Sequence, residues 1–230
     1  MKNEYLNFFL KNNINFKEIK VNENISILEG NLVLNHTFEG EPIYKSLIVK
    51  IIFYKNYPHK LPKIYSISPK IKISYHINPN GSLCLGTELE IRKKLVYQDY
   101  SLESWINEFV YSYFYSYFYY IKYKRSPYGE RSHGDIGDIE AAIDFFNFKN
   151  FNLFYKFLKK FTSIRKYRRI LKYKKNNLKK YCPCNSGKKI NDCHIKEILL
   201  LKKIYKKKTL EYMEELVKKY EQYWKESKYK

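Results

Sequence analysis

The chain has 230 residues, of which 44% are hydrophobic and 18% aromatic; this composition excludes a disordered chain and allows one or two globular domains. Its net charge of +21 is concentrated in residues 151–230, which hold 25 Lys and Arg but only seven Asp and Glu. The longest uncharged apolar run, residues 109–121, is shorter than the ~18 residues that span a membrane, and the N-terminus lacks a signal-peptide core. We therefore expect a soluble cytoplasmic protein without membrane contact. In that compartment its cysteines should be reduced.

The first 125 residues predict an α+β fold. A short helix is expected over residues 3–13, and β-rich, partly alternating patterns follow at residues 25–38, 39–54 and 63–68. We interpret these as a four-stranded antiparallel meander. A helix with Ser101 as its N-cap is predicted to run to Lys124, with its tyrosines and phenylalanines packed on the sheet.

The second half predicts mainly helix. The pattern over residues 137–161 is helical, and apolar residues continue at three- and four-residue spacing as far as Leu171, which gives the basic segment an apolar face. A final helix also has one apolar face, formed by Met213, Leu216, Val217, Tyr220, Tyr223 and Trp224. We expect this face to pack on the cysteine-rich segment before it, on the preceding helix or on a partner.

A cysteine-rich segment near the C-terminus has metal-binding spacing. Its order is C-x-C-x8-C-H, formed by Cys182, Cys184, Cys193 and His194. Three thiolates and an imidazole can complete a tetrahedral Zn²⁺ site, which predicts one structural zinc per chain. Residues 181–194 resemble the SEC-C motif, a small zinc-binding module of the Sec translocase motor that is also appended to other bacterial proteins. The resemblance implies a structural or partner-docking zinc without an open position for catalysis. Asn185 stands where the motif usually has glycine.

The fourth cysteine, Cys84, lies in the loop HINPNGSLCLG, about 100 residues from the other three. A cysteine between Leu83 and Leu85 is more often a buried small hydrophobe than a nucleophile. Gly81 and Gly86 on either side, however, permit the backbone to present the thiol for attack on an acyl carbonyl. Both interpretations remain open from these residues.

The order of motifs resembles the ubiquitin-conjugating (E2) fold over residues 1–125. The residues that carry the resemblance are Tyr57, Pro58 and Pro62 in a YPxxPP-like turn, His76 and Asn78 at the outer positions of an HPN tripeptide, Gly81, Cys84 and Leu85 around the active cysteine, and Trp105 in the following helix. Ile77 replaces the tripeptide's proline, and five residues separate Asn78 from Cys84, two fewer than usual. Shortened loops of this kind occur among bacterial E2-like proteins of CBASS antiphage operons, the branch that the sequence most resembles.

The resemblance implies an enzyme that carries a protein C-terminus as a thioester on Cys84 and transfers it to a lysine or another amine. Asn78 would donate its amide to the oxyanion or hold the loop in shape, beside His76 of the same motif. His133 could act at the mouth of the site as a base or gate, or it could stabilise a turn. Glu88 and Glu90 could orient an incoming lysine or belong to a solvated acidic loop.

The implied partners are a protein substrate with a conjugated C-terminus, an E1-like activating enzyme and, as a target, a CD-NTase-like cyclase that makes cyclic oligonucleotides. The chain has no GxxxxGK[ST] phosphate loop with which to adenylate a carboxylate itself. The resemblance also divides the chain into an E2-like domain (1–125), a loop and basic helical connector (126–178), and a zinc module with a C-terminal helix (179–230).

Two other functions fit the sequence. One is an inactive relative of the same fold that serves as a binding adaptor. The other is a nucleic-acid-binding protein, because Lys and Arg interleaved with Tyr in residues 163–181 could neutralise phosphates and stack on bases. The apolar spacing in that segment instead favours a packed helix with one basic face.

Overall fold

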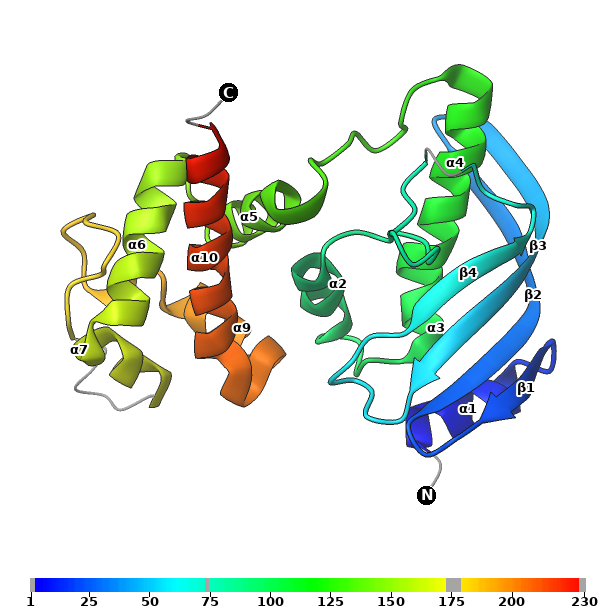
Figure 1. Ribbon diagram of the computed structural model, residues 1–230, viewed down its shortest axis with the longest axis horizontal. Coiled ribbons are helices and arrows are strands. Elements are labelled where there is room, and N and C mark those ends of the chain that lie inside the picture. Colours follow the sequence, from blue (N-terminus) through cyan, green and yellow to red (C-terminus); the bar gives the residue numbers. More distant parts are fainter. Residues whose placement is uncertain (1–2, 73–74, 173–178, 228–230) are drawn as a thin grey trace. The chain divides into compact units, whose positions relative to one another are not determined.

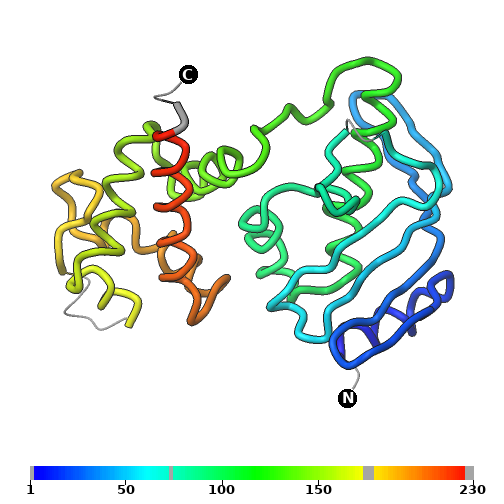
Figure 2. Tube along the Cα trace, in the orientation of Figure 1, coloured from blue at the N-terminus to red at the C-terminus, as the bar shows by residue number. Residues whose placement is uncertain are grey.

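The computed structural model describes residues 3–72, 75–172 and 179–227. The chain divides into two compact units, Met1–Glu130 and Arg131–Lys230. The first unit confirms the α+β prediction, with a four-stranded antiparallel sheet and flanking helices, and the described part of the second is built from helices and turns (Figures 1 and 2). Residues 173–178 of the basic segment lie outside the described residues.

The sheet follows chain order, with each strand antiparallel to the next: β1 (Phe16–Val21), β2 (Ile25–Phe38), β3 (Glu41–Tyr54) and β4 (Lys63–Ser68). β2 and β3 pair along their whole length, up to Phe38 opposite Glu41. Glu39 and Gly40 join them with φ angles of +50° and +79°. Positive φ at both central residues matches the right-handed twist of the two strands, which favours this tight hairpin.

Helices cover one face of the sheet. That face carries the buried residues Leu28, Leu32, Leu34, Leu47, Val49, Ile51 and Phe53, which occupy alternate positions along most of β2 and β3. Across it run α3 (Leu102–Trp105), a π-helical turn η1 (Ile106–Val110) and α4 (Tyr111–Tyr123), as Figure 1 shows. The predicted N-cap is confirmed, because Ser101 Oγ accepts a hydrogen bond from the Ser104 N–H at 3.0 Å. The aromatic side chains of α4 do form the core, with Phe114 and Tyr115 fully buried.

Two further helices complete the first unit. α1 (Glu4–Asn12) matches the predicted helix, and its N-cap Asn3 donates to the carbonyls of Lys55 and Tyr57 at 3.1 and 3.0 Å, which fastens the helix to the end of β3. α2 (Glu88–Leu95) was not predicted. It begins with a reciprocal capping box between Thr87 and Glu90, a pattern that is present in the sequence.

The second unit contains α5 (Gly134–Phe145), α6 (Phe151–Ser163), α7 (Arg165–Arg168), η2 (Arg169–Lys172), η3 (Ile190–Asp192), α9 (Ile195–Tyr205), η4 (Lys206–Lys208) and α10 (Thr209–Ser227). The helix expected over residues 137–161 is two helices, because Asn147 adopts a φ of +55° and Asn150 caps α6. The final helix packs on α5, α6 and α9 with Met213, Leu216 and Tyr220 buried. None of the helices in the described ranges is long and apolar enough to span a bilayer.

Candidate functional site

The loop ahead of Cys84 is a tight hairpin. Ile77 and Leu83 pair as an antiparallel bridge. Between them Gly81 adopts a φ of +80°, and its N–H donates to the carbonyl of Asn78 at 2.8 Å. Glycine adopts this left-handed conformation without a steric penalty. Because Cys84 directly follows the bridge, the turn determines where the thiol lies.

Backbone hydrogen bonds attach this hairpin to the sheet. The Leu83 N–H donates to the carbonyl of Ile64 in β4 at 2.8 Å, and the Cys84 N–H donates to the carbonyl of His76 at 2.8 Å. His76 has a φ of +40°, which is uncommon for a residue with a side chain. Its Nε2 lies 3.9 Å from a carboxylate oxygen of Glu130. His76 therefore supports the cysteine through its backbone, while its ring faces an acidic side chain.

The Asn78 amide is used inside the loop. Its Nδ2 donates to Ser82 Oγ at 3.0 Å and to the Leu83 carbonyl at 3.3 Å. Ser82 in turn donates to Asn80 Oδ1 through its N–H at 3.0 Å and its hydroxyl at 2.7 Å. This network is the geometry expected of an asparagine that holds the loop in shape, the second of the two roles considered for it.

The thiol of half-buried Cys84 borders a hollow of about 420 Å³ that is also lined by Asn78. Pro62, Trp105 and residues of β4 complete its walls. A second hollow of about 650 Å³ shares Leu85 and Gly86 with the first and extends along α2. The cysteine thus lies beside two concave surfaces that are large enough for peptide or side-chain segments.

Tyr113 is a neighbour of the cysteine that the sequence did not single out. Its hydroxyl donates to the Tyr75 carbonyl at 3.1 Å. Burial raises the pKa of Tyr113, and the nearby Tyr75 and Cys84 raise it further, so the phenol stays protonated. Only helical spacing marked this residue in the sequence, which is a signal for packing rather than for a place beside a thiol.

The two acidic residues after the cysteine have structural partners. Glu90 accepts hydrogen bonds from the N–H and hydroxyl of Thr87 at 3.2 and 2.7 Å. Glu88 accepts one from Arg92 Nε at 2.6 Å. Both carboxylates therefore stabilise the start of α2. Glu88 also lines the hollow beside Cys84, and a role toward an incoming lysine stays a prediction.

Arg92 joins α2 to the Tyr57-Pro58 turn. Its guanidinium is buried and donates to the carbonyls of Pro58 at 2.7 Å and His59 at 2.8 Å. That turn leads to Pro62, which lines the hollow beside Cys84. Arginine suits the position because its planar group can satisfy several acceptors at once.

Replacing Arg92 with methionine should lower the free energy of unfolding of the first unit by ~1–3 kcal/mol, because the part-buried hydrogen bonds to the carbonyls of Pro58 and His59 lose their donor. Chemical denaturation followed through the fluorescence of buried Trp105 measures this change. Lys93→Met on the exposed side of the same helix is the control, expected within ~0.5 kcal/mol of the native chain. Equal stabilities of the two variants would contradict the assigned role of Arg92.

The four predicted metal ligands lie together in the second unit. The ligand atoms of Cys182, Cys184, Cys193 and His194 are all within 4.8 Å of one another. His194 Nδ1 lies 3.3 Å from the Cys182 sulfur and 3.1 Å from the Cys193 sulfur, and the sulfurs of Cys184 and Cys193 are 3.5 Å apart. Three thiols and one imidazole nitrogen converging in this way form a cluster that could hold a metal ion and is compatible with zinc.

The turn between the ligand pairs explains this convergence. Tyr181 and Lys189 form an antiparallel bridge, and Asn185 and Gly187 have φ angles of +65° and +74°. Asparagine therefore does adopt the left-handed conformation at the position where the SEC-C motif usually has glycine. Ser186, in the same turn, has its hydroxyl 3.2 Å from the Cys184 sulfur and 3.4 Å from the Cys193 sulfur. Hydrogen bonds from this hydroxyl would orient the two sulfurs if a metal ion were bound.

The core of the second unit orients the histidine ligand. The His194 ring stacks on Phe148 with 4.8 Å between centroids and a 9° interplanar angle, and Phe157 lies 5.2 Å away. Burial lowers the pKa of His194, so its imidazole is neutral near pH 7, the form that binds metal. A hydrogen bond to the backbone of Phe146 opposes this shift and holds the ring.

His133 occupies the N-cap position of α5 in the second unit, where its side chain is exposed and does not cap the helix. Cys84 belongs to the first unit. The role of His133 as a base or gate at the cysteine therefore stays a prediction.

Comparisons of the chain with models of protein families, with curated proteins and with solved structures return no match.

Proposed function

We propose that the chain is an E2-like conjugating enzyme that carries a protein C-terminus on Cys84. The observation that supports this most is that the Cys84 thiol and Asn78 line one hollow at the end of a hairpin fastened to an antiparallel sheet. The motif order described above, from the Tyr57-Pro58 turn to Trp105, is the second support. Bacterial antiphage defence of the CBASS type, with a cyclic-oligonucleotide synthase as the conjugated protein or the target, is the cellular setting that the resemblance implies.

The proposed reaction is two acyl transfers. In the first, the Cys84 thiolate attacks the thioester of an activating enzyme, and the tetrahedral intermediate collapses by expelling that enzyme's thiolate. In the second, a lysine amine attacks the Cys84 thioester, an amide bond forms, and Cys84 leaves as a thiolate while the amine gives up its proton. The acyl group arrives activated as a thioester, so the exchange needs no cationic side chain beside the thiol.

The test is to isolate the protein from its native cells in acid without reductant. Mass spectrometry should find Cys84 joined to the C-terminal carboxyl of another protein, and a thiol reductant should release that protein. Finding Cys84 free, and no conjugate that depends on it, would instead favour the adaptor function. The carried protein identified in this way becomes the substrate for the assays below.

Asn78→Ala should slow transfer of the acyl group from the thioester to lysine by ~10²-fold and should slow formation of the thioester less. The variant lacks either a hydrogen-bond donor to the oxyanion that forms when the amine attacks, or the amide that holds the loop carrying the thiol. Single-turnover discharge of the preformed thioester measures it. Ser82→Ala separates the two causes. It removes a partner of the Asn78 amide at 3.0 Å, so it should reproduce much of the loss if Asn78 holds the loop, and little if the amide meets the oxyanion. A normal rate in Asn78→Ala would contradict both roles.

We also propose that Cys182, Cys184, Cys193 and His194 hold one structural Zn²⁺. The donor set, its spacing and the hydroxyl of Ser186 beside two of the sulfurs support this choice of metal. Zinc bound there would contribute folding free energy to the second unit. The SEC-C resemblance adds a possible docking role for the same module.

A further inference from the structure

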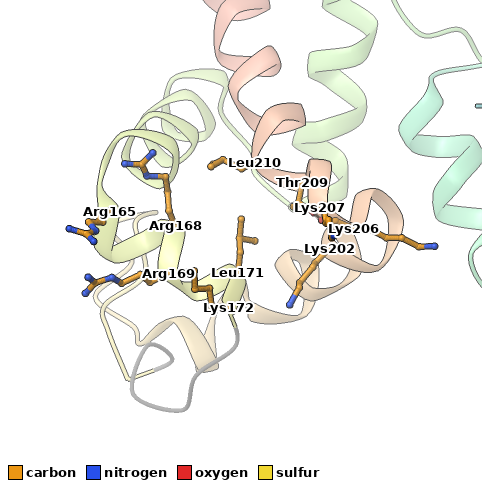
Figure 3. A pocket seen from close by; sticks show the side chains of 10 residues that line it. All are labelled: Arg165, Arg168, Arg169, Leu171, Lys172, Lys202, Lys206, Lys207, Thr209 and Leu210. Carbon is orange, nitrogen blue, oxygen red and sulfur yellow. Dashed lines mark hydrogen bonds between the residues drawn. The ribbon is translucent and has the colours of Figure 1, made fainter. Parts of the chain in front are cut away.

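A basic pocket lies within the second unit, away from the metal ligands in sequence. Its volume is about 900 Å³, and its lining is Arg165, Arg168, Arg169, Leu171, Lys172, Lys202, Lys206, Lys207, Thr209 and Leu210. Seven of these ten residues are cationic, and none of the residues lining this described pocket is acidic. Figure 3 shows Leu171 and Leu210 between Arg165, Arg168 and Arg169 on one side and Lys202, Lys206 and Lys207 on the other, with the guanidinium groups and the Lys206 amine extended away from the two leucines.

Helix geometry concentrates these charges. Tyr167 and Ile170 are buried and anchor α7 and η2, which leaves Arg165, Arg168 and Arg169 exposed on the outer side of the same turns. On the facing wall, the buried residues of α9 anchor a helix whose end continues into the three lysines of η4. The two walls meet because η2 packs on α9. Seven cationic side chains around one pocket give it a positive potential, which favours an anion there.

The start of α10 adds to the positive potential. Thr209 is the first residue of this 19-residue helix, lines the pocket, and donates its hydroxyl to the Lys206 carbonyl at 2.7 Å. The N-terminus of a helix carries a partial positive charge that favours anions. It reinforces the arginine and lysine side chains at the same place.

The size and lining of the pocket favour a small ligand over a nucleic-acid strand. A volume of about 900 Å³ lies within the range of small-molecule sites, roughly 300–1,000 Å³. Single strands are usually held by aromatic platforms, and no aromatic side chain is among the lining residues of the described pocket. Leu171 and Leu210 offer an apolar contact for a flat ring, while the cations are suited to phosphate oxygens.

We propose that this pocket binds a small molecule with several linked phosphates, of the nucleoside polyphosphate class. The cations contact the phosphates and the two leucines contact the base. All lining residues of the pocket belong to the second unit, and none of them is Cys182, Cys184, Cys193 or His194. Binding in this pocket does not depend on the proposed conjugating activity.

Calorimetry on the intact, metal-loaded protein tests this, with adenosine triphosphate, inorganic tripolyphosphate and adenosine as probes. Adenosine triphosphate should bind once per chain, tripolyphosphate more weakly because it lacks the ring, and adenosine not measurably. Raising the salt concentration from about 50 to about 200 mM should weaken the binding of adenosine triphosphate and of tripolyphosphate severalfold. Absence of binding by adenosine triphosphate would overturn the proposal.

Paired charge reversals locate the site. Arg168→Glu with Lys207→Glu reverses one cation on each wall and should weaken the binding of adenosine triphosphate at least tenfold. Lys156→Glu with Lys218→Glu changes the net charge equally at exposed positions of α6 and α10 outside the pocket. The affinity of this double variant for adenosine triphosphate should stay within twofold of that of the native chain. Equal losses in the two double variants would overturn the assignment. So would a single-stranded oligonucleotide that binds at least tenfold more tightly than adenosine triphosphate, with affinity rising with its length.

Discussion

Cys182→Ser is expected to reduce bound zinc from one ion per chain to near zero and to unfold or loosen the second unit. Serine replaces a sulfur ligand that lies 3.3 Å from the imidazole nitrogen of His194, so the remaining three ligands no longer close a tetrahedral site. The apparent free energy of zinc binding in small zinc modules is ~10–16 kcal/mol, which is as large as the whole free energy of unfolding of a typical domain. Elemental analysis measures the metal.

The part of the chain that loses structure in Cys182→Ser tests the proposed ligand set. Hydrogen exchange should show lost protection around His194 and Phe148, which stack on each other, and unchanged protection in the sheet of the first unit. Cys84→Ser is the matched control and should keep one zinc per chain. Native protein without zinc, or zinc lost from the Cys84→Ser variant, would contradict the proposed ligand set.

Cys84→Ala is expected to reduce conjugation by at least ~10³-fold, to the assay background, because it removes the sulfur that is proposed to carry the acyl group. Cys84→Ser should instead accumulate an oxyester that resists thiol reductants, or form no adduct. An ester is a poorer acyl donor to an amine than a thioester is. Gel electrophoresis with and without reductant, using the protein substrate found on Cys84, distinguishes these outcomes.

Two controls make this result specific to the thiol. Both variants should retain the metal and unfold at the temperature of the native protein, since the half-buried thiol makes few of the contacts that stabilise the core. An alkylating reagent should label Cys84 in the native chain. If the thiol resists alkylation and Cys84→Ala keeps full biological activity, the enzyme proposal fails and a binding adaptor takes its place.

Local patterns allowed much of the fold to be predicted. The alternation of residues 25–38 and 39–54 predicted β2 and β3, because a strand exposes successive side chains to opposite faces. Ser101 marked the start of α3 because a hydroxyl at that position can satisfy a free N–H of the first turn. The helix α2 and its capping box were missed, although Thr87 and Glu90 stand at the right spacing.

The metal cluster was also predictable from spacing. Its four ligands lie within 13 residues, Cys182 to His194, so turn geometry alone brings them together. Cys84 was separated from them by about 100 residues of sequence, and the structure places it in the other unit. Its chemistry remains a proposal that rests on its motif and its surroundings.

The sequence by itself determined most of the elements and the grouping of Cys182, Cys184, Cys193 and His194, since these depend on contacts between residues close together in the chain. The tertiary structure alone decided which distant groups meet, the Arg92 guanidinium with the Pro58 carbonyl and the His194 ring with Phe148. It also placed the arginines of α7 and η2 and the lysines of α9 and η4 around one pocket. Such pairs depend on how whole helices pack, and no short-range pattern encodes that packing. The basic pocket is therefore visible only in the folded chain, although its charge was evident in the sequence.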